Sequence, residues 1–298
     1  LRVILSGHSV TLLTTEDDPK LGELRAKVDV VNVPRRNTTS NRLFGGFFRV
    51  VQKHYNYVKS QSDIIEYLDK SAVNADLLYA YEIGFVPGVV GFAKKTGKTC
   101  VSRFQGTILT DLVQPVSGLR KLRLYLQFYD HIKAMRASSD LTLMTDDGTK
   151  GDRVLKYLRQ RHSGEIRFFK NGVDSPQLDY VSQTYQKYHA HGDIVFSSVS
   201  RLQRWKRVDR SIEIFAKFNS RFNNSHYYIV GDGPEIENLK KLAYQKGLHG
   251  CVSFLGAQEK HQIYGLLKDT KYFLSSYELS NLGNPLFEAI SCGAIVVT

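Results

Sequence analysis

"DIVFSSVSRLQRWKRVDRSIEIFAKFNSRFNNSHYYIVGDGP" occupies residues 193–234. Short, nearly continuous apolar runs lie near its two ends, which is typical of strands that are buried on both faces. Between them, residues 208–222 carry apolar side chains at helical spacing. A strand, a helix and a second strand in this order favour two parallel strands joined by a helical crossover.

The same alternation runs along the whole chain. Strands are predicted at residues 9–15, 28–34, 75–81, 98–104, 140–145, 165–174, 193–202, 226–234, 251–257, 270–276 and 293–298. Helix-like segments separate them, and this pattern favours parallel sheets covered by helices on both faces. The strands are too many for one ordinary sheet. The polar segment 174–193 interrupts the pattern, so we predict an α/β chain of two doubly wound domains, residues 1–176 and 177–298.

Composition narrows the class of protein. The 298 residues are 42% apolar and 23% charged, as in ordinary soluble globular proteins. Three scattered cysteines have no metal or redox spacing, which favours a reducing compartment and a fold without metal. No apolar run reaches the ~18 residues of a membrane span.

The net charge of +12 fits three kinds of partner: nucleic acid, an anionic membrane surface or phosphorylated small molecules. No zinc-finger, homeodomain or RNP-type motif is present, so we do not expect nucleic acid. A merely solvated basic surface is the alternative to all three.

Two cations follow the strand predicted at 193–202. Ligands of parallel sheets bind at the carboxyl ends of strands, close to helix N-termini. Arg201 and Lys206 lie at such a place and resemble a diphosphate clamp, in which arginine supplies a bidentate fork and lysine a point charge. A basic surface loop is the alternative. Gly231 and Gly233 follow the next strand, but Ile236 occupies the third glycine position of a dinucleotide fingerprint, so a tight turn is favoured over nicotinamide binding.

The stretch "YELSNLGNPLFEAISCG", residues 277–293, forms a further strand-to-helix turn. Pro285 fits the first turn of a helix, and the backbone N–H groups of Leu282, Gly283 and Asn284 are placed to face an anion. Glu288 lies about one turn into the helix, where a carboxylate accepts hydrogen bonds from sugar or ribose hydroxyls. Favourable placement in a first turn is the alternative role for Glu288.

These motifs occur together in one family. The chain resembles the retaining glycosyltransferases of family 4, in the glycosyl transferases group 1, almost along its whole length. The resemblance rests on "GHSVTLLTTED", "KNGVD", "SRLQRWKRVD", "IVGDGPEIENL", "VSFLG" and "NPLFEAISCGAIVVT", in the order and spacing of the family. It implies the GT-B fold, in which two Rossmann-like domains face a central cleft.

The resemblance also implies roles for single residues. Arg201 and Lys206 match the pair that holds the donor diphosphate and stabilises the departing phosphate, in place of a metal. Glu288 matches the glutamate that binds the ribose. The other donor-site positions are Gln258 beside the base, Ser280 eight residues before Glu288, and the turn of Leu282, Gly283 and Asn284.

Three positions depart from the family. Ser280 stands where the first glutamate of the E-x7-E motif is usual, Gln105 where a histidine is usual, and Ser200 where a glycine is usual. Glu278 would need a two-residue bulge to replace the missing glutamate. On the acceptor side we single out Glu82, Arg103 and Gln105.

The resemblance implies a hexosyltransferase that moves a sugar from a nucleotide-diphosphate sugar to a hydroxyl acceptor with retention. The expected acceptor is a glycan or a lipid-linked molecule, the expected location is cytoplasmic or peripheral at the inner membrane face, and no metal or cofactor is expected. A nucleotide-sugar 2-epimerase on the same fold stays open, and so does a non-catalytic nucleotide-sugar binder, which Ser280 and Gln105 favour. Relatives begin with a further strand and glycine-rich loop and end with further helices, so we expect a fragment truncated at both ends.

Residues 118–136 are predicted to form one amphipathic helix. Leu119, Leu122, Leu126 and Tyr129 share one face, which Arg120, Lys121 and Arg123 flank. Such a face fits contact with anionic lipid. A core-facing helix with a solvated basic side is the alternative.

Overall fold

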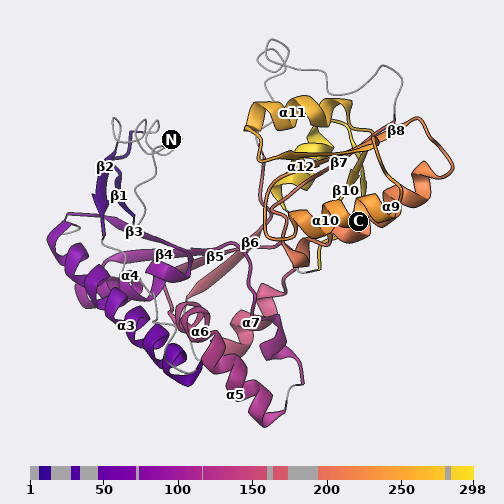
Figure 1. Ribbon diagram of the computed structural model, residues 1–298. Coiled ribbons are helices and arrows are strands. Elements are labelled where there is room, and N and C mark those ends of the chain that lie inside the picture. The colour runs from indigo at the N-terminus through magenta and orange to yellow at the C-terminus, as the bar shows by residue number, and fades with distance from the viewer. Residues whose placement is uncertain are drawn as a thin grey trace. The chain divides into compact units, whose positions relative to one another are not determined.

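The structure is a computed structural model that describes residues 7–14, 28–33, 46–71, 74–115, 117–159, 164–173, 194–278 and 283–298. The chain divides into two compact units (Figure 1). The first unit comprises Leu1–Met144 and Gly151–Phe168, and the second comprises Thr145–Lys150 and Phe169–Thr298. The boundary predicted between residues 176 and 177 lies outside the described residues.

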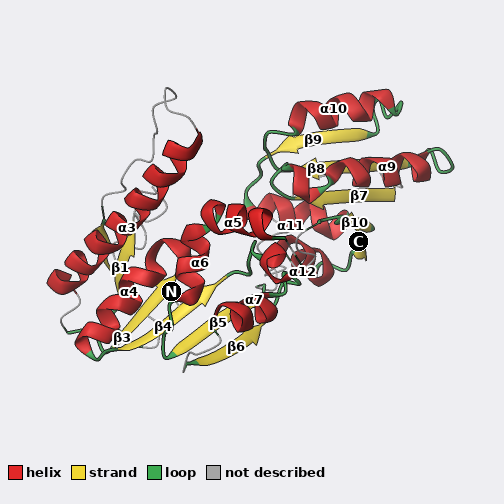
Figure 2. Cartoon of the chain, turned by 90° about the horizontal axis from the view of Figure 1, so that it is seen from below, coloured by secondary structure: helices red, strands yellow, loops and turns green. Residues whose placement is uncertain are grey.

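The first unit is built on a four-stranded sheet of order β3-β4-β5-β6 (Figure 2). Its strands are β3 (Leu77–Tyr81), β4 (Thr99–Phe104), β5 (Leu141–Thr145) and β6 (Glu165–Phe169). A separate parallel pair is formed by β1 (Thr11–Thr14) and β2 (Asp29–Asn32). Because β3, β4 and β5 pair in parallel, their carboxyl ends lie at one edge of the sheet.

Helices pack around one apolar core in the first unit. They are α3 (Gly46–Ser71), α4 (Glu82–Thr96), α5 (Gly118–Gln127), α6 (Tyr129–Arg136), α7 (Gly151–Leu158) and the 3-10 helix η2 (Thr110–Val113). The most apolar of them, α4, packs on β3 and β4, and α3 and α6 pack on α4. The side chains of Val86, Val90 and Phe92 are therefore buried in the centre of this layer.

The single helix predicted over residues 118–136 is wrong in one respect, since it is broken between α5 and α6. Phe128 leaves the helical region with φ −111° and ψ 29°. Its ring packs against the core of the first unit and lies edge-on to His131, with the ring centroids 6.0 Å apart. The break thus coincides with the packing of Phe128 against the core, which the apolar spacing alone did not indicate.

The second unit is a five-stranded sheet of order β11-β10-β7-β8-β9. Its strands are β7 (Ile194–Val199), β8 (Ser225–Val230), β9 (Val252–Gly256), β10 (Tyr272–Leu274) and β11 (Ile295–Val297). All neighbouring strands are parallel. The helices are α9 (Val208–Asn219), α10 (Ile236–Gln245), α11 (Lys260–Asp269), α12 (Asn284–Ser291) and the 3-10 helix η3 (Arg204–Lys206).

Two apolar cores cover the two faces of this sheet, and Figure 1 shows helices on both of those faces. Phe196, Tyr227 and Ile229 face α9 and α10. Their sequence neighbours Val195 and Tyr228 point to the opposite face, toward α11 and α12. Strands that bury both sets of alternating side chains need near-continuous apolar sequence, so the predicted parallel α/β architecture is confirmed.

Within the described residues, no helix combines the length and the apolar character that crossing a membrane requires.

Phe215 on α9 offers a test of this packing. Its ring is fully buried and lies 5.2 Å and 5.3 Å, between centroids, from Phe196 and Tyr227. Phe215→Ala should lower the free energy of unfolding by about 3–5 kcal/mol, because it leaves a cavity between helix and sheet. Denaturant unfolding measures this loss. The half-exposed Phe222 provides the control, and an equal loss in Phe222→Ala would contradict the assigned core.

Candidate functional site

The carboxyl ends of β7, β8, β9 and β10 place their loops together in the second unit. Leu202 N donates to Asp232 O at 2.8 Å, and Gly231 N donates to Gly256 O at 2.7 Å. Glu278 N, after β10, donates to Trp205 O at 3.0 Å. Backbone hydrogen bonds thus tie the loop of Arg201 and Lys206 to its neighbours on both sides.

Gly231 and Gly233 make this arrangement possible. A Cβ atom at Gly231 would lie 1.9 Å from Ser200 O, and one at Gly233 would lie 2.5 Å from Leu202 O. Gly231 also has φ +124°, which a residue with a side chain rarely adopts. The two glycines therefore allow the loop after β8 to press against the loop after β7. Helix α10 begins at Ile236, two residues after Pro234.

Lys206 is held between two aromatic rings. Its Nζ lies 4.1 Å from the centroid of the Trp205 ring and 3.6 Å from that of Tyr277. Burial lowers the pKa of Lys206 to about 8, and the positive charge of Arg201 lowers it further in the same direction. The two cations predicted as a clamp therefore lie close enough to interact, Lys206 half-buried and Arg201 exposed.

The two rings are fixed by their own polar groups. Tyr277 is buried and donates its hydroxyl to Val199 O at 3.2 Å, and burial raises its pKa to about 12. Trp205 Nε1 donates to Gln203 Oε1 at 2.7 Å. The sequence analysis predicted neither ring as a partner of Lys206. For Trp205 a signal was available, because this aromatic residue directly precedes the candidate cation.

The side chain of Glu278 contacts arginines that follow the same loop. Its carboxylate accepts a hydrogen bond from Arg207, and Arg210 Nη2 lies 3.7 Å from Glu278 Oε1. Arg207 in turn binds Asp209 at 3.0 Å. The carboxylate thus anchors the segment after β10 to the start of α9. Ser280, two residues further along the chain, lies outside the described residues.

Helix α12 begins at Asn284 with Gly283 as its N-cap and Pro285 in its first turn, as predicted. Among the described residues no side chain caps this helix, so its first-turn backbone leaves N–H groups without a side-chain acceptor. Leu282 lies outside the described residues.

Glu288 lies beyond the first turn of α12, which contains no acidic residue. The role of a first-turn acid therefore does not apply. Its side chain is mostly buried, and Lys260 Nζ lies 3.9 Å from Glu288 Oε1. Burial raises the pKa of the Glu288 carboxyl, which the charge of Lys260 opposes. Gln258 is close in sequence to Lys260, and its Nε2 donates to Leu255 O at 2.6 Å.

The three residues that the sequence assigned to the acceptor side, Glu82, Arg103 and Gln105, lie together in the first unit. Tyr81 of β3 pairs with Arg103 of β4, so Glu82 and Gln105 follow at the carboxyl edge. Gln105 N donates to Glu82 Oε1 at 3.0 Å. Burial raises the pKa of Glu82, and this hydrogen bond and the charge of Arg103 oppose the rise.

Glu82 adopts a strained backbone, with φ +63°. A left-handed conformation costs a residue with a side chain about 1–3 kcal/mol, and such strain clusters at functional sites. Here it places a carboxylate directly after the end of β3, on the first residue of α4.

The second unit thus carries the kinds of group that bind an anionic ligand with hydroxyl groups. Arg201, Lys206 and the N-terminus of α12 supply positive potential, and Glu288 supplies a hydrogen-bond acceptor.

Comparison with known proteins agrees with this reading of the second unit. Residues 183–298 match the family Glycosyl transferases group 1. The alpha-monoglucosyldiacylglycerol synthase of Acholeplasma laidlawii is 23% identical over 150 residues, which are 48% of this chain and 38% of that protein. The chain therefore spans well under half of the length of this curated relative.

Two solved structures match both units. HepE of Anabaena in complex with UDP and glucose has a TM-score of 0.62 at 17% identity, over 96% of this chain and 71% of its own. The sucrose-phosphate synthase of Thermosynechococcus elongatus has a TM-score of 0.68 at 13% identity, over 99% and 72%. The fold is accordingly the α/β fold of GT-B glycosyltransferases.

Proposed function

We propose that the chain belongs to a glycosyltransferase that moves a hexose from a nucleotide-diphosphate sugar to a hydroxyl acceptor with retention. The observation that carries the proposal is the pair Arg201 and Lys206 at the carboxyl edge of the second sheet, with Lys206 fixed between two rings. The match of residues 183–298 to Glycosyl transferases group 1 supports it.

In this proposal the second unit stabilises the leaving group. The bond from the sugar C1 to the β-phosphate oxygen breaks, and its electron pair stays on the phosphate. The acceptor oxygen bonds to C1 on the same face, and its proton passes to the departing phosphate oxygen. Arg201, Lys206 and the N-terminus of α12 lie where the negative charge develops, so they lower the barrier without a metal.

The proposal also assigns residues to the ribose, the base, the phosphate and the acceptor. Glu288 binds the ribose hydroxyls, Gln258 lies beside the base, and Gly283 and Asn284 meet the phosphate through backbone N–H groups. Glu82, Arg103 and Gln105 contact the acceptor. Because HepE was crystallised with UDP and glucose, a UDP-sugar is the first donor to test.

The acceptor is a glycan or a lipid-linked molecule, in glycan, glycolipid or polysaccharide biosynthesis, and the enzyme works in the cytoplasm. The name of the Acholeplasma relative, a glucosyldiacylglycerol synthase, favours the lipid-linked class.

Product analysis tests the reaction itself. The chain is incubated with UDP-glucose and a diacylglycerol acceptor, and the products are separated by mass spectrometry and NMR. We expect an α-glucoside and free UDP. Formation of an epimerised nucleotide sugar would instead indicate an isomerase, and tight binding without turnover would indicate a non-catalytic binder.

Lys206 predicts a pH dependence of donor binding. Its protonated form binds the diphosphate, so the bound-state pKa must lie above the free value of about 8. Affinity for UDP-glucose should stay nearly constant below about pH 7 and fall about fivefold from pH 8 to pH 9, over which the diphosphate does not titrate. Calorimetry across this range measures the fall.

Two variants of Lys206 test whether its charge causes this pH dependence. Lys206→Arg keeps its charge, so its pH profile should be flat, whereas Lys206→Ala should lose about 1.5–3 kcal/mol at neutral pH. Lys217, exposed on α9, provides the control, and Lys217→Ala should keep the parent profile. A parent profile that does not fall above pH 8 would contradict the contact between Lys206 and the diphosphate.

Glu288 is tested by a double-mutant cycle. Glu288→Gln keeps the shape but removes the charged acceptor, so affinity for UDP should fall by about 1.5–3 kcal/mol. Binding of 2′,3′-dideoxy-UDP, which lacks the hydroxyls, should change little. Calorimetry gives both values. Equal losses for the two nucleotides would rule out the ribose contact.

A further inference from the structure

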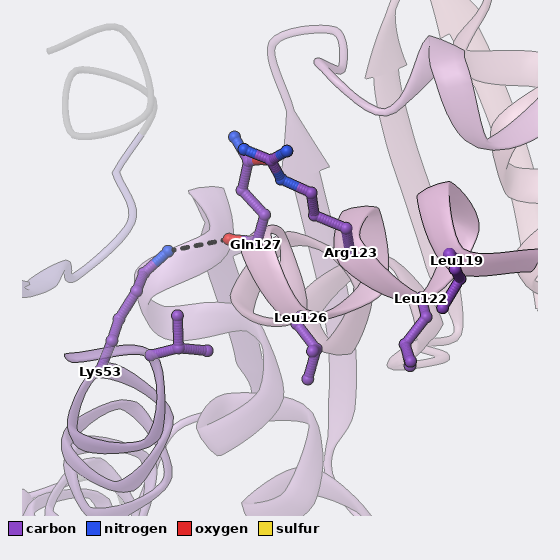
Figure 3. Close-up of a pocket in the computed structure, with 7 residues that line it drawn as sticks. Lys53, Leu119, Leu122, Arg123, Leu126 and Gln127 are labelled. Carbon is purple, nitrogen blue, oxygen red and sulfur yellow. Dashed lines mark hydrogen bonds between the residues drawn. The ribbon is translucent and has the colours of Figure 1, made fainter. Parts of the chain in front are cut away.

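Helix α5 turns its leucines outward. Leu119 is 86% exposed, Leu122 is 56% exposed and Leu126 is 40% exposed. No residue of α5 is buried. In Figure 3 the three side chains point to the same side of the helix. Exposed large apolar side chains that gather on one helix face mark an interaction site more often than scattered ones do.

The opposite face of α5 already has its packing partners. Leu124 and Tyr125 pack against the core of the first unit. Tyr125 donates its hydroxyl to that of Tyr157 at 3.3 Å, and Lys121 Nζ lies 5.1 Å from the centroid of the Tyr157 ring. The core side of the helix is therefore the side of Leu124 and Tyr125, and a core-facing role for Leu119, Leu122 and Leu126 is wrong.

A groove of about 870 Å³ runs between α5 and α3 (Figure 3). It is lined by Val50, Lys53, Leu119, Leu122, Arg123, Leu126 and Gln127. Lys53 Nζ donates to Gln127 O at 3.4 Å and lies 2.9 Å from Asp130 Oδ2, and His54 Nε2 lies 2.7 Å from Leu126 O. These contacts bind the end of α5 to α3 and hold the leucine face in place.

Basic side chains border the leucines. Arg120 and Arg123 are exposed, and no acidic partner is recorded for either among the described residues. Arg123 lies on the same helix as the leucines and reaches to the side of Gln127 in Figure 3. The whole chain carries a net charge of +12, so an anionic partner is attracted from a distance as well.

We propose that this surface, formed by Leu119, Leu122, Leu126, Arg120 and Arg123, rests on an anionic lipid bilayer. The leucines enter the boundary between headgroups and acyl chains, and the two arginines bind lipid phosphates. A bilayer is favoured over a protein partner because exposed arginines border the leucines and the whole chain carries a net charge of +12, which an anionic surface attracts.

The length of α5 sets the strength of the contact. Its ten residues span about 15 Å, so only the three leucines enter the lipid. So small an apolar anchor binds weakly, and the arginines must supply much of the attraction. Binding should therefore require anionic lipid and weaken with salt, because screening shortens the range of the charges.

Sedimentation with vesicles tests the proposal on the whole chain. Vesicles of phosphatidylcholine with about one third phosphatidylglycerol should pellet the protein, and pure phosphatidylcholine should bind it at least tenfold more weakly. No nucleotide or acceptor is present. A chain that transfers no sugar can therefore still pass this test, and an active transferase can fail it.

Matched pairs of variants locate the surface. Leu119→Glu with Leu122→Glu, and separately Arg120→Glu with Arg123→Glu, should each lower partitioning at least tenfold. The controls in the second unit are Phe222→Glu with Tyr244→Glu, and Lys217→Glu with Arg221→Glu, which change exposed residues of the same kinds. They should keep most of the parent binding. Thermal melting confirms that each variant is folded.

A third kind of variant should bind the vesicles more tightly than the parent chain does. Leu119→Trp should tighten partitioning several-fold, because tryptophan prefers the membrane interface. Equal binding to neutral and anionic vesicles overturns the proposal, and so does equal loss in the variants and their controls. Absence of binding to both kinds of vesicle also overturns it and leaves the leucine face to a protein partner.

Discussion

The second unit depends on one close contact between two backbones. Gly231 and Gly233 lie against the carbonyl groups of Ser200 and Leu202, at distances that no side chain allows. This contact fixes the loop after β7 against the loop after β8, and hydrogen bonds continue the join to Gly256 and Glu278. Arg201 and Lys206 are carried by that loop. Their position thus follows from two missing Cβ atoms in the neighbouring loop.

The sequence predicted the strands and most helices well because their signals are local. Apolar runs such as that of β8 and the spacing along α9 need only neighbouring residues to be recognised. The places of Arg201, Lys206 and Glu288 at strand-to-helix turns were also predictable, since each lies at a fixed distance from a strand or a helix start, and their roles stay predictions. The pairing of Lys206 with Tyr277, and of Arg207 with Glu278, was not predictable, because these residues lie far apart in the sequence and meet only through the order of the strands.

The prediction of a single helix over residues 118–136 failed for a related reason. A regular apolar spacing over residues 118–136 is compatible with one long helix, but the backbone leaves the helical region at Phe128, whose ring packs against the core of the first unit. The same turn separates the packing of α6 from that of α5. Helix α6 has buried residues and α5 has none. The same amphipathic pattern therefore belongs to one helix that packs in the core and to one that lies at the surface.

The environment of Lys206 has a further chemical consequence. An amine whose pKa lies at about 8 is half neutral at that pH, whereas an ordinary surface lysine is almost wholly protonated. Only the neutral amine is a nucleophile, and here it lies between the rings of Trp205 and Tyr277. Lys206 is thus predisposed to acylation by activated esters or reversible imine formation with aldehydes. A covalent reagent that carries an anionic group would find in this loop both its binding contact and its reactive atom.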